Sequence, residues 1–177
     1  MPNSGQVIVA VDRFAFTSNN ISYAVAGDLI DYWGFFPAPG DWGRIPVMAY
    51  VDVIASACDG VEVGERFFGF VPMATHHVVE ARATSEGFFD VSDHRESHAA
   101  VYRQFGRTTT DPLYHERLED ETLLLRGLFM TSFLVDDFLA DHDHYGAQTL
   151  LISSASSKTS IALAACAAER GHDRVVG

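Results

Sequence analysis

The chain has 177 residues, enough for one domain with a substantial core and part of a second. Its apolar content of 47% indicates a globular protein, and its net charge of −12 argues against nonspecific binding to nucleic acid or anionic membranes. No secretory signal and no apolar run of about 18 residues occurs in the sequence, so we expect a cytoplasmic protein without a membrane partner.

The N-terminal part of the chain predicts a series of short strands. Residues 6–12 are rich in β-branched side chains, which favour a strand. Residues 17–20 can cap a short helix over 21–27. Further strands are predicted at 47–57, 67–71 and 75–80. Short strands joined by glycine and proline turns indicate a small antiparallel barrel.

Two segments interrupt this pattern. The aromatic loop over 33–42 either lines an apolar substrate pocket or plugs the barrel. Residues 88–117 are polar and have no sustained period, so a long polar insertion is predicted there.

In the predicted strand 75–80, His76 and His77 point to opposite faces, and we expect one of them to be buried with a hydrogen bond.

The C-terminal part predicts helices and the beginning of a parallel sheet. Apolar residues at three-to-four spacing predict a helix over 119–139. An apolar strand at 149–153, a serine-rich turn, an alanine-rich helix to Arg170 and a strand at 174–176 are typical of a βαβ unit.

Metal ligands are sparse in the sequence. The two cysteines, Cys58 and Cys166, match no metal pattern and no disulfide framework. The loop 141–144, Asp-His-Asp-His, is either a surface metal site or a solvated linker.

One stretch carries a resemblance to a known family. Residues 63–70, VGERFFGF, are similar to the V-G-D-R-V-x-G stretch of the medium-chain dehydrogenase/reductase superfamily. Residues 72–76 and 128–139 resemble an uncharacterised bacterial branch of it, the domain of unknown function 2855. The resemblance implies a mixed α/β fold, with a GroES-like β-barrel followed by the first βαβ part of an incomplete Rossmann domain. The implied divisions are 1–118 for the barrel, 119–146 for a connecting helix and linker, and 147–177 for the nucleotide-binding part.

The resemblance also suggests site residues in the barrel. Residues 17–20 and 47–49 lie where the zinc-dependent branch has its metal ligands, and they offer no thiolate, imidazole or carboxylate. We therefore expect no zinc and no other metal, and the zinc-independent quinone oxidoreductase branch is the nearer relative. Asn20 corresponds to an asparagine of that branch, with Asn19 as the alternative. Tyr23 and Tyr50 are candidate proton donors near a nicotinamide, with a role in the core as the alternative.

The serine-rich turn is the candidate cofactor site. Ser154, Ser157 and Ser160 stand where the family has the glycines of its phosphate-binding turn. Serine adds a hydroxyl donor but loses easy access to positive φ. Lys158 adds a positive charge, and Thr131 corresponds to a threonine that approaches the cofactor. The alternative is a serine-capped helix without a ligand; a P-loop is disfavoured because both of its glycines are absent.

Together these features predict a zinc-independent, NAD(P)-linked reductase-like protein acting on a small carbonyl or quinone. The residue that selects NAD or NADP normally follows the second strand, so we expect the unit to be incomplete and inactive as a reductase by itself. The alternatives are a non-catalytic GroES-like interaction module and a non-functional truncated product. A small-molecule substrate and a homo-oligomer remain open, and no nucleic-acid partner is expected.

Overall fold

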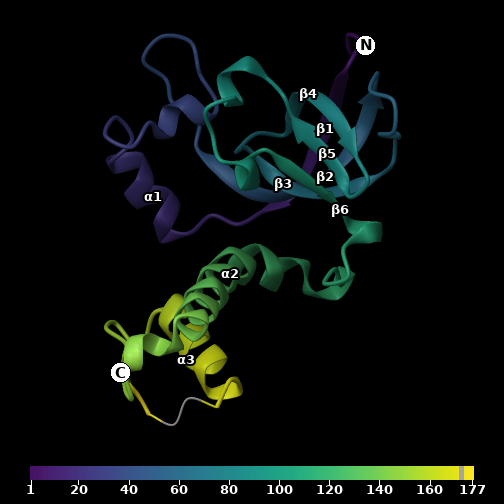
Figure 1. The fold of residues 1–177 in the computed structure, drawn as a ribbon. Helices are drawn as coiled ribbons and strands as arrows, with labels where there is room; N and C mark the ends of the chain where they lie inside the picture. The colour runs from purple at the N-terminus through teal and green to yellow at the C-terminus, as the bar shows by residue number, and fades with distance from the viewer. Residues whose placement is uncertain (172–173) are drawn as a thin grey trace. The chain divides into compact units, whose positions relative to one another are not determined.

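The computed structural model describes residues 1–171 and 174–177. The chain forms two compact units, Met1–Asp120 and Glu121–Gly177, which are described separately (Figure 1). The first unit contains a closed antiparallel barrel, and the second contains helices and a small parallel sheet. The fold is therefore of mixed α/β class, with three α-helices in the described part of the chain.

Six strands close the barrel in the order β1-β2-β3-β6-β5-β4. The antiparallel barrel predicted from the spacing of short strands is therefore confirmed. Closure leaves no free sheet edge in this unit, which removes the usual route to edge-to-edge association. The bounds of the six strands are β1 (Gln6–Phe14), β2 (Pro46–Ser56), β3 (Arg66–Pro72), β4 (His76–Thr84), β5 (Gly87–Asp90) and β6 (Gln104–Arg107).

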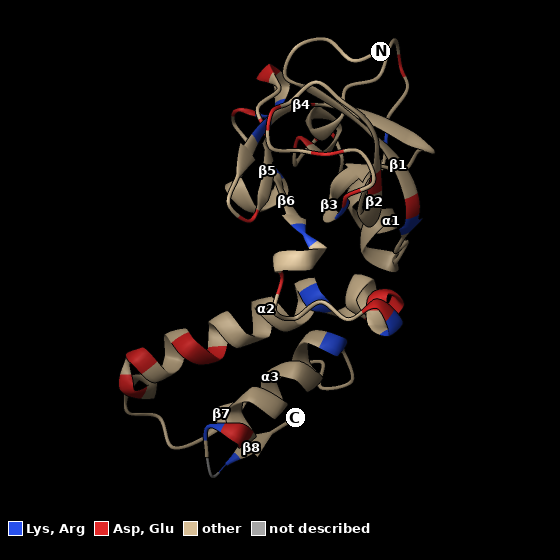
Figure 2. Cartoon of the chain, turned by 90° about the vertical axis from the view of Figure 1, so that its right-hand side faces the viewer, with Lys and Arg blue, Asp and Glu red and all other residues tan. Residues whose placement is uncertain are grey.

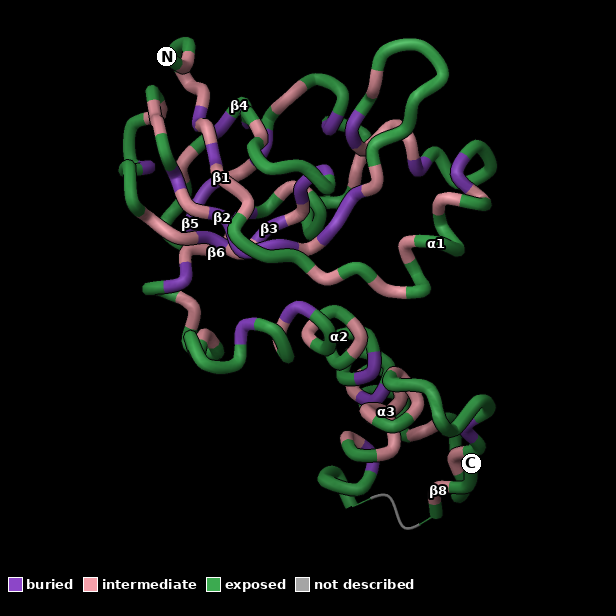
Figure 3. The backbone as a smooth tube through the Cα atoms, turned by 180° about the vertical axis from the view of Figure 1, so that it is seen from behind, coloured by how far each residue is buried: buried purple, intermediate pink, exposed green. Residues whose placement is uncertain are grey.

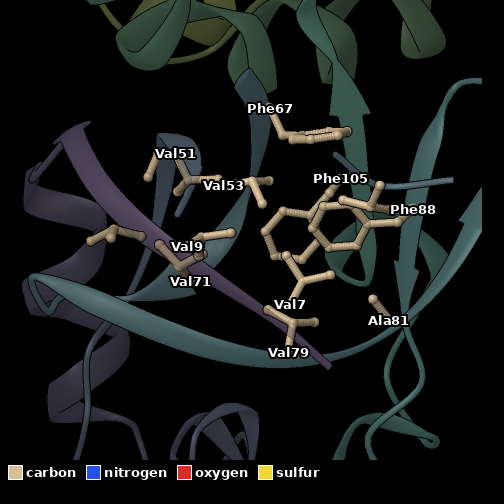
Figure 4. Packing of buried hydrophobic residues seen from close by; sticks show 13 residues of the cluster. Val7, Val9, Val51, Val53, Phe67, Val71, Val79, Ala81, Phe88 and Phe105 are labelled. Atoms are coloured by element: carbon tan, nitrogen blue, oxygen red, sulfur yellow. The ribbon is translucent and has the colours of Figure 1, made fainter. Parts of the chain in front are cut away.

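The barrel interior is filled by valines on one side and by phenylalanines on the other (Figure 4). Phe88 and Phe105 stack with ring centroids 4.4 Å apart, and Phe67 meets the Phe88 ring edge-on at 4.8 Å. The valines alternate along β1 and β2 with residues that face outward, as a half-buried strand requires. The buried residues that form this core are Val7, Val9, Val47, Ala49, Val51, Val53, Val61, Phe67, Val71, Val79, Ala81, Phe88 and Phe105.

The long polar loop predicted over 88–117 is wrong in its secondary structure. Most of β5 and all of β6 lie in this segment, and these two strands close the barrel. Each has only four residues, among them glycine and polar side chains, so neither shows a strand pattern. They form because Phe88 and Phe105 are brought into register from distant positions and packed in the core.

The aromatic loop is held by a buried arginine from the same polar segment. Arg95 is 0% exposed and its guanidinium lies 4.5 Å from the Phe36 ring centroid. Its Nη1 donates to the carbonyl of Phe35 at 2.9 Å, and its Nε lies 3.6 Å from Asp90 Oδ2. Burial lowers the pKa of Arg95 to about 10, so the side chain stays charged at neutral pH. Phe36, which belongs to this loop, is thereby held in a buried position and is 2% exposed.

Three α-helices are described, two of them in the second unit. Helix α1 (Ser18–Val25) follows β1, helix α2 (Glu119–Asp141) begins at the end of the barrel unit, and helix α3 (Lys158–Glu169) lies near the C-terminus. Short 3-10 helices occupy several connections: η1 (Tyr32–Phe35), η2 (Asp93–Arg95), η3 (Ala100–Tyr102), η4 (Thr108–Thr110), η5 (Glu116–Leu118) and η6 (Asp143–Gly146).

The second unit contains a βαβ arrangement, as its sequence pattern predicts. Strand β7 (Leu150–Leu151) pairs in parallel with β8 (Val175–Val176), and α3 connects them. Side-chain hydrogen bonds join α2 to α3 and to its C-cap residue: Ser132 Oγ donates to the carbonyl of Thr159 at 2.8 Å, and Arg170 donates to Asp136 Oδ2 at 2.7 Å and to Asp137 Oδ1 at 3.2 Å. Acidic residues recur along α2 (Figure 2), and the Asp136–Arg170 pair uses one of them for packing.

Candidate functional site

Asn20 is used to begin helix α1. Its Oδ1 accepts a hydrogen bond from the backbone N–H of Thr17 at 2.8 Å, which forms a capping box. Its Nδ2 donates to the carbonyl of Pro46 at 2.9 Å and so joins the helix to the start of β2. Both ends of the amide therefore have structural partners.

The two candidate tyrosines lie in different surroundings. Tyr23 is 48% exposed, and its ring lies 5.8 Å from that of Tyr32. Tyr50 is 1% exposed, with its ring 5.3 Å from Phe68 and 5.9 Å from Tyr114. Tyr50 is therefore packed like a core residue, which is the alternative that the sequence left open.

Sequence reasoning missed a charged cluster beside Tyr50, centred on Arg66. The guanidinium lies 5.3 Å from the Tyr50 ring centroid. Its Nε and Nη2 each donate to Glu119 at 2.8 Å, its Nη1 donates to Asp52 at 2.8 Å, and Nη2 also donates to Asp12 at 2.6 Å. The sequence contains both partners, the arginine of the VGERFFGF stretch and the acidic residues at the start of α2. No pattern in the sequence indicates that they form an ion pair.

The ionisation of this cluster follows from its hydrogen bonds. The hydrogen bond from Arg66 is the largest influence on Glu119 and lowers the pKa of that carboxyl group. Burial, followed by the hydrogen bond that its hydroxyl donates to Glu119 at 2.9 Å, raises the pKa of Tyr114. Glu119 is therefore held as a carboxylate and Tyr114 as a neutral phenol.

The same residues line a cavity of about 590 Å³. All three nitrogens of Arg66 already donate to carboxylates, so the guanidinium has little capacity for a ligand. The cluster therefore acts as a structural anchor for the residues that precede α2. The lining residues are Asp12, Arg13, Asp52, Arg66, Tyr114, Glu116, Arg117 and Glu119.

The serine turn between β7 and α3 brings several predicted residues together. Ser154 has a φ of 52°, the left-handed conformation that usually favours glycine. Ser157 is the N-cap of α3, and its Oγ accepts from the backbone N–H of Ser160 at 3.1 Å. Its hydroxyl also donates to Ser160 Oγ at 2.8 Å, and Ser160 Oγ donates to the carbonyl of Ser153 at 3.1 Å.

Lys158 is the first residue of α3 and is the single lysine in the sequence. Thr131 lies on α2, is exposed, and donates from Oγ1 to the carbonyl of Gly127 at 3.0 Å. The residue that joins α2 to the first turn of α3 is its neighbour Ser132, which is 0% exposed. The structure thus gathers Ser154, Ser157, Lys158 and Ser160 in one turn, with Thr131 on the adjacent helix.

Two further findings concern metals and membranes. Among residues 1–171 and 174–177, no three His, Cys, Asp or Glu side chains gather closely enough to hold a metal ion. In the loop 141–144, His142 instead stacks on Tyr145 at 5.3 Å, and its Nδ1 lies 2.7 Å from the carbonyl of Phe138. In the described part of the chain, no helix has both the length and the apolar character needed to cross a membrane.

Comparison with known proteins places these features in one family. No curated protein matches the chain significantly. The family model described as "Protein of unknown function (DUF2855)" matches residues 14–177, which include strands β2 to β6 of the barrel and the whole second unit. The chain belongs to the DUF2855 family.

Proposed function

We propose that this chain is a zinc-independent, NAD(P)-linked, reductase-type protein that binds the pyrophosphate of the dinucleotide at the turn between β7 and α3. The substrate class that accompanies this proposal is a small carbonyl or quinone. The observation that carries the proposal is the conformation of Ser154, whose φ of 52° lies in the left-handed region that glycine reaches without strain, and glycines are the residues that phosphate-binding turns normally use.

The turn has the donors that a phosphate group requires. The first N–H groups of a helix lack intrahelical acceptors, and the helix dipole adds partial positive charge there. The turn leads from a strand of a parallel pair into the connecting helix, which is the position of the pyrophosphate in dinucleotide-binding folds. The hydroxyls of Ser157 and Ser160 hold this turn in shape through their hydrogen bonds.

The position of Lys158 supports an anionic ligand. A cation in the first turn of a helix opposes the helix dipole and costs about 0.3–1 kcal/mol. The chain has one lysine among twelve basic residues, and that lysine lies at this unfavourable position. A bound phosphate reverses the sign of this interaction, because both the dipole and the ammonium group then face a negative charge.

The barrel residues contribute less directly to the proposal. Asn20 and Tyr50 are engaged in capping and packing, and Tyr23 is a partly exposed phenol. Of these three residues, Tyr23 is therefore the one whose side chain reaches solvent and can act as a proton donor. Cofactor binding is the step that can be tested first.

The single lysine permits a selective test. Reductive methylation with ¹³C-formaldehyde labels Lys158 and the N-terminal amine, so a ¹³C NMR spectrum contains an internal control. Titration with NADPH and NADH is expected to shift the Lys158 signal and to leave the N-terminal signal unchanged. Shifts of both signals together, or of neither at millimolar cofactor, would contradict the proposal.

Unmodified variants supply the matched comparison. Calorimetric titration of Lys158→Gln is expected to show about tenfold weaker binding, because a charge-assisted contact to phosphate is lost. Arg82→Gln removes an exposed charge from β4 of the other unit and is expected to bind as the parent chain does. Equal losses in both variants would attribute the binding to net charge rather than to the turn.

A second candidate function, a non-catalytic interaction module, rests on the exposed apolar residues of α2. Eight large apolar side chains of this helix are between 40% and 57% exposed, although Leu123 is buried, and exposed positions recur along the helix (Figure 3). Contiguous apolar surface on a helix is typical of an interaction site. We propose a second copy of this chain as the partner, and the residues concerned are Leu124, Leu125, Phe129, Met130, Phe133, Leu134, Val135 and Phe138.

Light scattering coupled to size exclusion tests this candidate. The parent chain is expected to elute as a dimer, and Phe129→Glu combined with Phe133→Glu is expected to elute as a monomer. Val25→Glu, an 86% exposed residue of α1, is the control and is expected to remain dimeric. A monomeric parent chain would remove this candidate.

A further inference from the structure

A second pocket, separate from the charged cluster around Arg66, lies in the barrel unit beside the beginning of β4. Its volume is about 520 Å³, within the usual range of about 300–1,000 Å³ for small-molecule sites. All of its lining residues belong to the first unit, whereas the serine turn belongs to the second. The lining residues are Phe36, Pro37, Arg44, Pro72, Ala74, His76, His77, Val78 and His94.

The charge of this pocket differs from that of the protein as a whole. The chain has 24 acidic and 12 basic residues, yet the lining contains one arginine, three histidines and no acidic residue. Arg44 is the charged residue of this lining, and the low-dielectric walls of a concave site concentrate the field that such a charge exerts on a ligand of the opposite sign. The pocket is therefore suited to an anion in an otherwise acidic protein.

The apolar wall of the pocket is already organised. The edge of the His77 ring meets the Phe36 ring, with centroids 5.3 Å apart and planes at 84°. Arg95 holds Phe36 through the cation–π contact described above. Pro37 and Pro72 add rigid apolar surface to the same lining. An aromatic or aliphatic group can pack here without ordering flexible side chains, which reduces the entropic cost of binding.

His77 contains an unpaired polar atom at this pocket. Its Nε2 is buried and has no hydrogen-bond partner among residues 1–171 and 174–177, although we expected the buried histidine of this pair to have one. Buried polar atoms of folded proteins nearly always have a partner. Burial lowers the pKa of His77 to about 4, so the ring is neutral at pH 7 and offers one N–H donor and one acceptor.

The rim of the pocket has a single full positive charge. Arg44 is exposed, and its Nη1 donates to the carbonyl of Pro37 at 2.5 Å, which anchors the guanidinium beside the apolar wall. Burial also lowers the pKa of His94, which favours its neutral form. One guanidinium beside the neutral imidazoles of His77 and His94 matches the charge and the planar geometry of one carboxylate better than those of a doubly charged phosphate.

We propose that this pocket binds a small aromatic monocarboxylate, with the carboxylate on Arg44 and the ring of the ligand against Phe36, Pro37 and Pro72. The imidazoles of His77 and His94 supply further N–H donors to the carboxylate. The ligand class is defined by one negative charge at one end and an apolar ring at the other.

Benzoate is the probe for the first experiment, with benzamide as its neutral isostere and acetate as its counterpart without a ring. Calorimetric titration of the whole chain is expected to show benzoate binding at least tenfold more tightly than either comparison compound. Equal affinities for benzoate and benzamide would overturn the anionic recognition, and equal affinities for benzoate and acetate would overturn the aromatic wall.

Variants and histidine signals locate the site. Arg44→Gln is expected to weaken benzoate binding about tenfold, and Arg82→Gln, an exposed arginine outside the pocket, is expected to leave it unchanged. With ¹³Cε1-labelled histidine, benzoate is expected to shift the signals of His77 and His94 and to leave those of His115 and His142 in place. Unchanged His77 and His94 signals, or equal effects of the two arginine variants, would overturn the proposal.

Discussion

Gly87 of β5 pairs directly with Gly106 of β6, at the place where the last two strands close the barrel. The next pair along the two strands is Phe88 with Phe105, whose rings stack in the core. A side chain at Gly87 would collide with the carbonyl oxygen of Phe105 and lie 3.0 Å from the backbone nitrogen of Arg107. The register that buries the two phenylalanines therefore depends on a glycine at position 87.

The first prediction follows from this difference between two paired glycines. Gly87→Ala is expected to lower the free energy of unfolding by more than about 3 kcal/mol, because the added methyl group meets backbone atoms that cannot move aside. Gly106→Ala is the control, since the nearest atom to its added carbon lies 4.0 Å away, and its expected cost is below about 1 kcal/mol. Urea denaturation measures both, and similar costs would contradict the prediction.

The second prediction concerns Arg66 and Glu119. The Glu119 side chain is only 3% exposed, so removing Arg66 takes away its main counter-charge and leaves a nearly buried carboxylate with the Tyr114 hydroxyl and with Arg13, whose Nε lies 3.4 Å away. Arg66→Met is expected to lower the free energy of unfolding by about 3 kcal/mol. Arg66→Met combined with Glu119→Leu is expected to recover most of this loss, because the buried charge is then absent. An additive double mutant in thermal denaturation would show that the two side chains are not coupled.

The third prediction is a pH dependence that arises from the Arg66 cluster. The pKa of Glu119 is lowered in the folded protein, so its contribution to stability is present above the ordinary value of 4.5 and is lost as the pH falls through the folded value. The parent chain is therefore expected to lose more stability than Arg66→Met on acidification below pH 4.5. Parallel curves of melting temperature against pH for the two proteins would contradict this.

The fourth prediction is a pH dependence that arises from His77. Burial lowers its pKa from 6.5 to about 4, so the unfolded state binds more protons between these values and stability falls as the pH falls from 6.5 to 4. The decrease for this one group amounts to about 3 kcal/mol. His77→Gln is expected to lack this part of the decrease, whereas His76→Gln, its exposed neighbour on β4, is expected to retain it. Urea titrations at pH 7 and pH 4.5 compare the three proteins.

The fifth prediction concerns the serine turn. Ser157→Ala is expected to lower stability by about 1 kcal/mol, since the N-cap hydrogen bond to the backbone of Ser160 is lost. Ser154→Gly is expected to raise stability by about 0.5–1 kcal/mol, because glycine adopts a φ of 52° without steric strain. Thermal denaturation is expected to show a lower melting temperature for Ser157→Ala and a higher one for Ser154→Gly than for the parent chain. A stabilising Ser157→Ala would contradict the capping geometry.

Local patterns predicted the elements whose signal is contained in their own residues. A run rich in β-branched residues indicated β1, because such side chains favour an extended backbone. Apolar residues at three-to-four spacing indicated α2, because side-chain direction repeats every 3.6 residues in a helix. The serine cap of α3 could also be predicted from the local sequence, because the capping hydrogen bond joins residues only three positions apart. The barrel followed from the number and spacing of these short strands.

The tertiary structure decided the features that depend on residues far apart in the chain. Strands β5 and β6 have four residues each and form through the pairing of Phe88 with Phe105. The partners of Arg66 come from positions 12, 52 and 119, and no sequence spacing indicates such an arrangement. Serine usually avoids positive φ, but Ser154 adopts a φ of 52°. The left-handed conformation costs about 1–2 kcal/mol for a residue with a side chain, and the contacts of the surrounding unit outweigh this cost. Local sequence therefore determined the elements with a pattern of their own, such as β1, α2 and α3, and packing between distant residues determined β5 and β6, the closure of the barrel and which side chains meet.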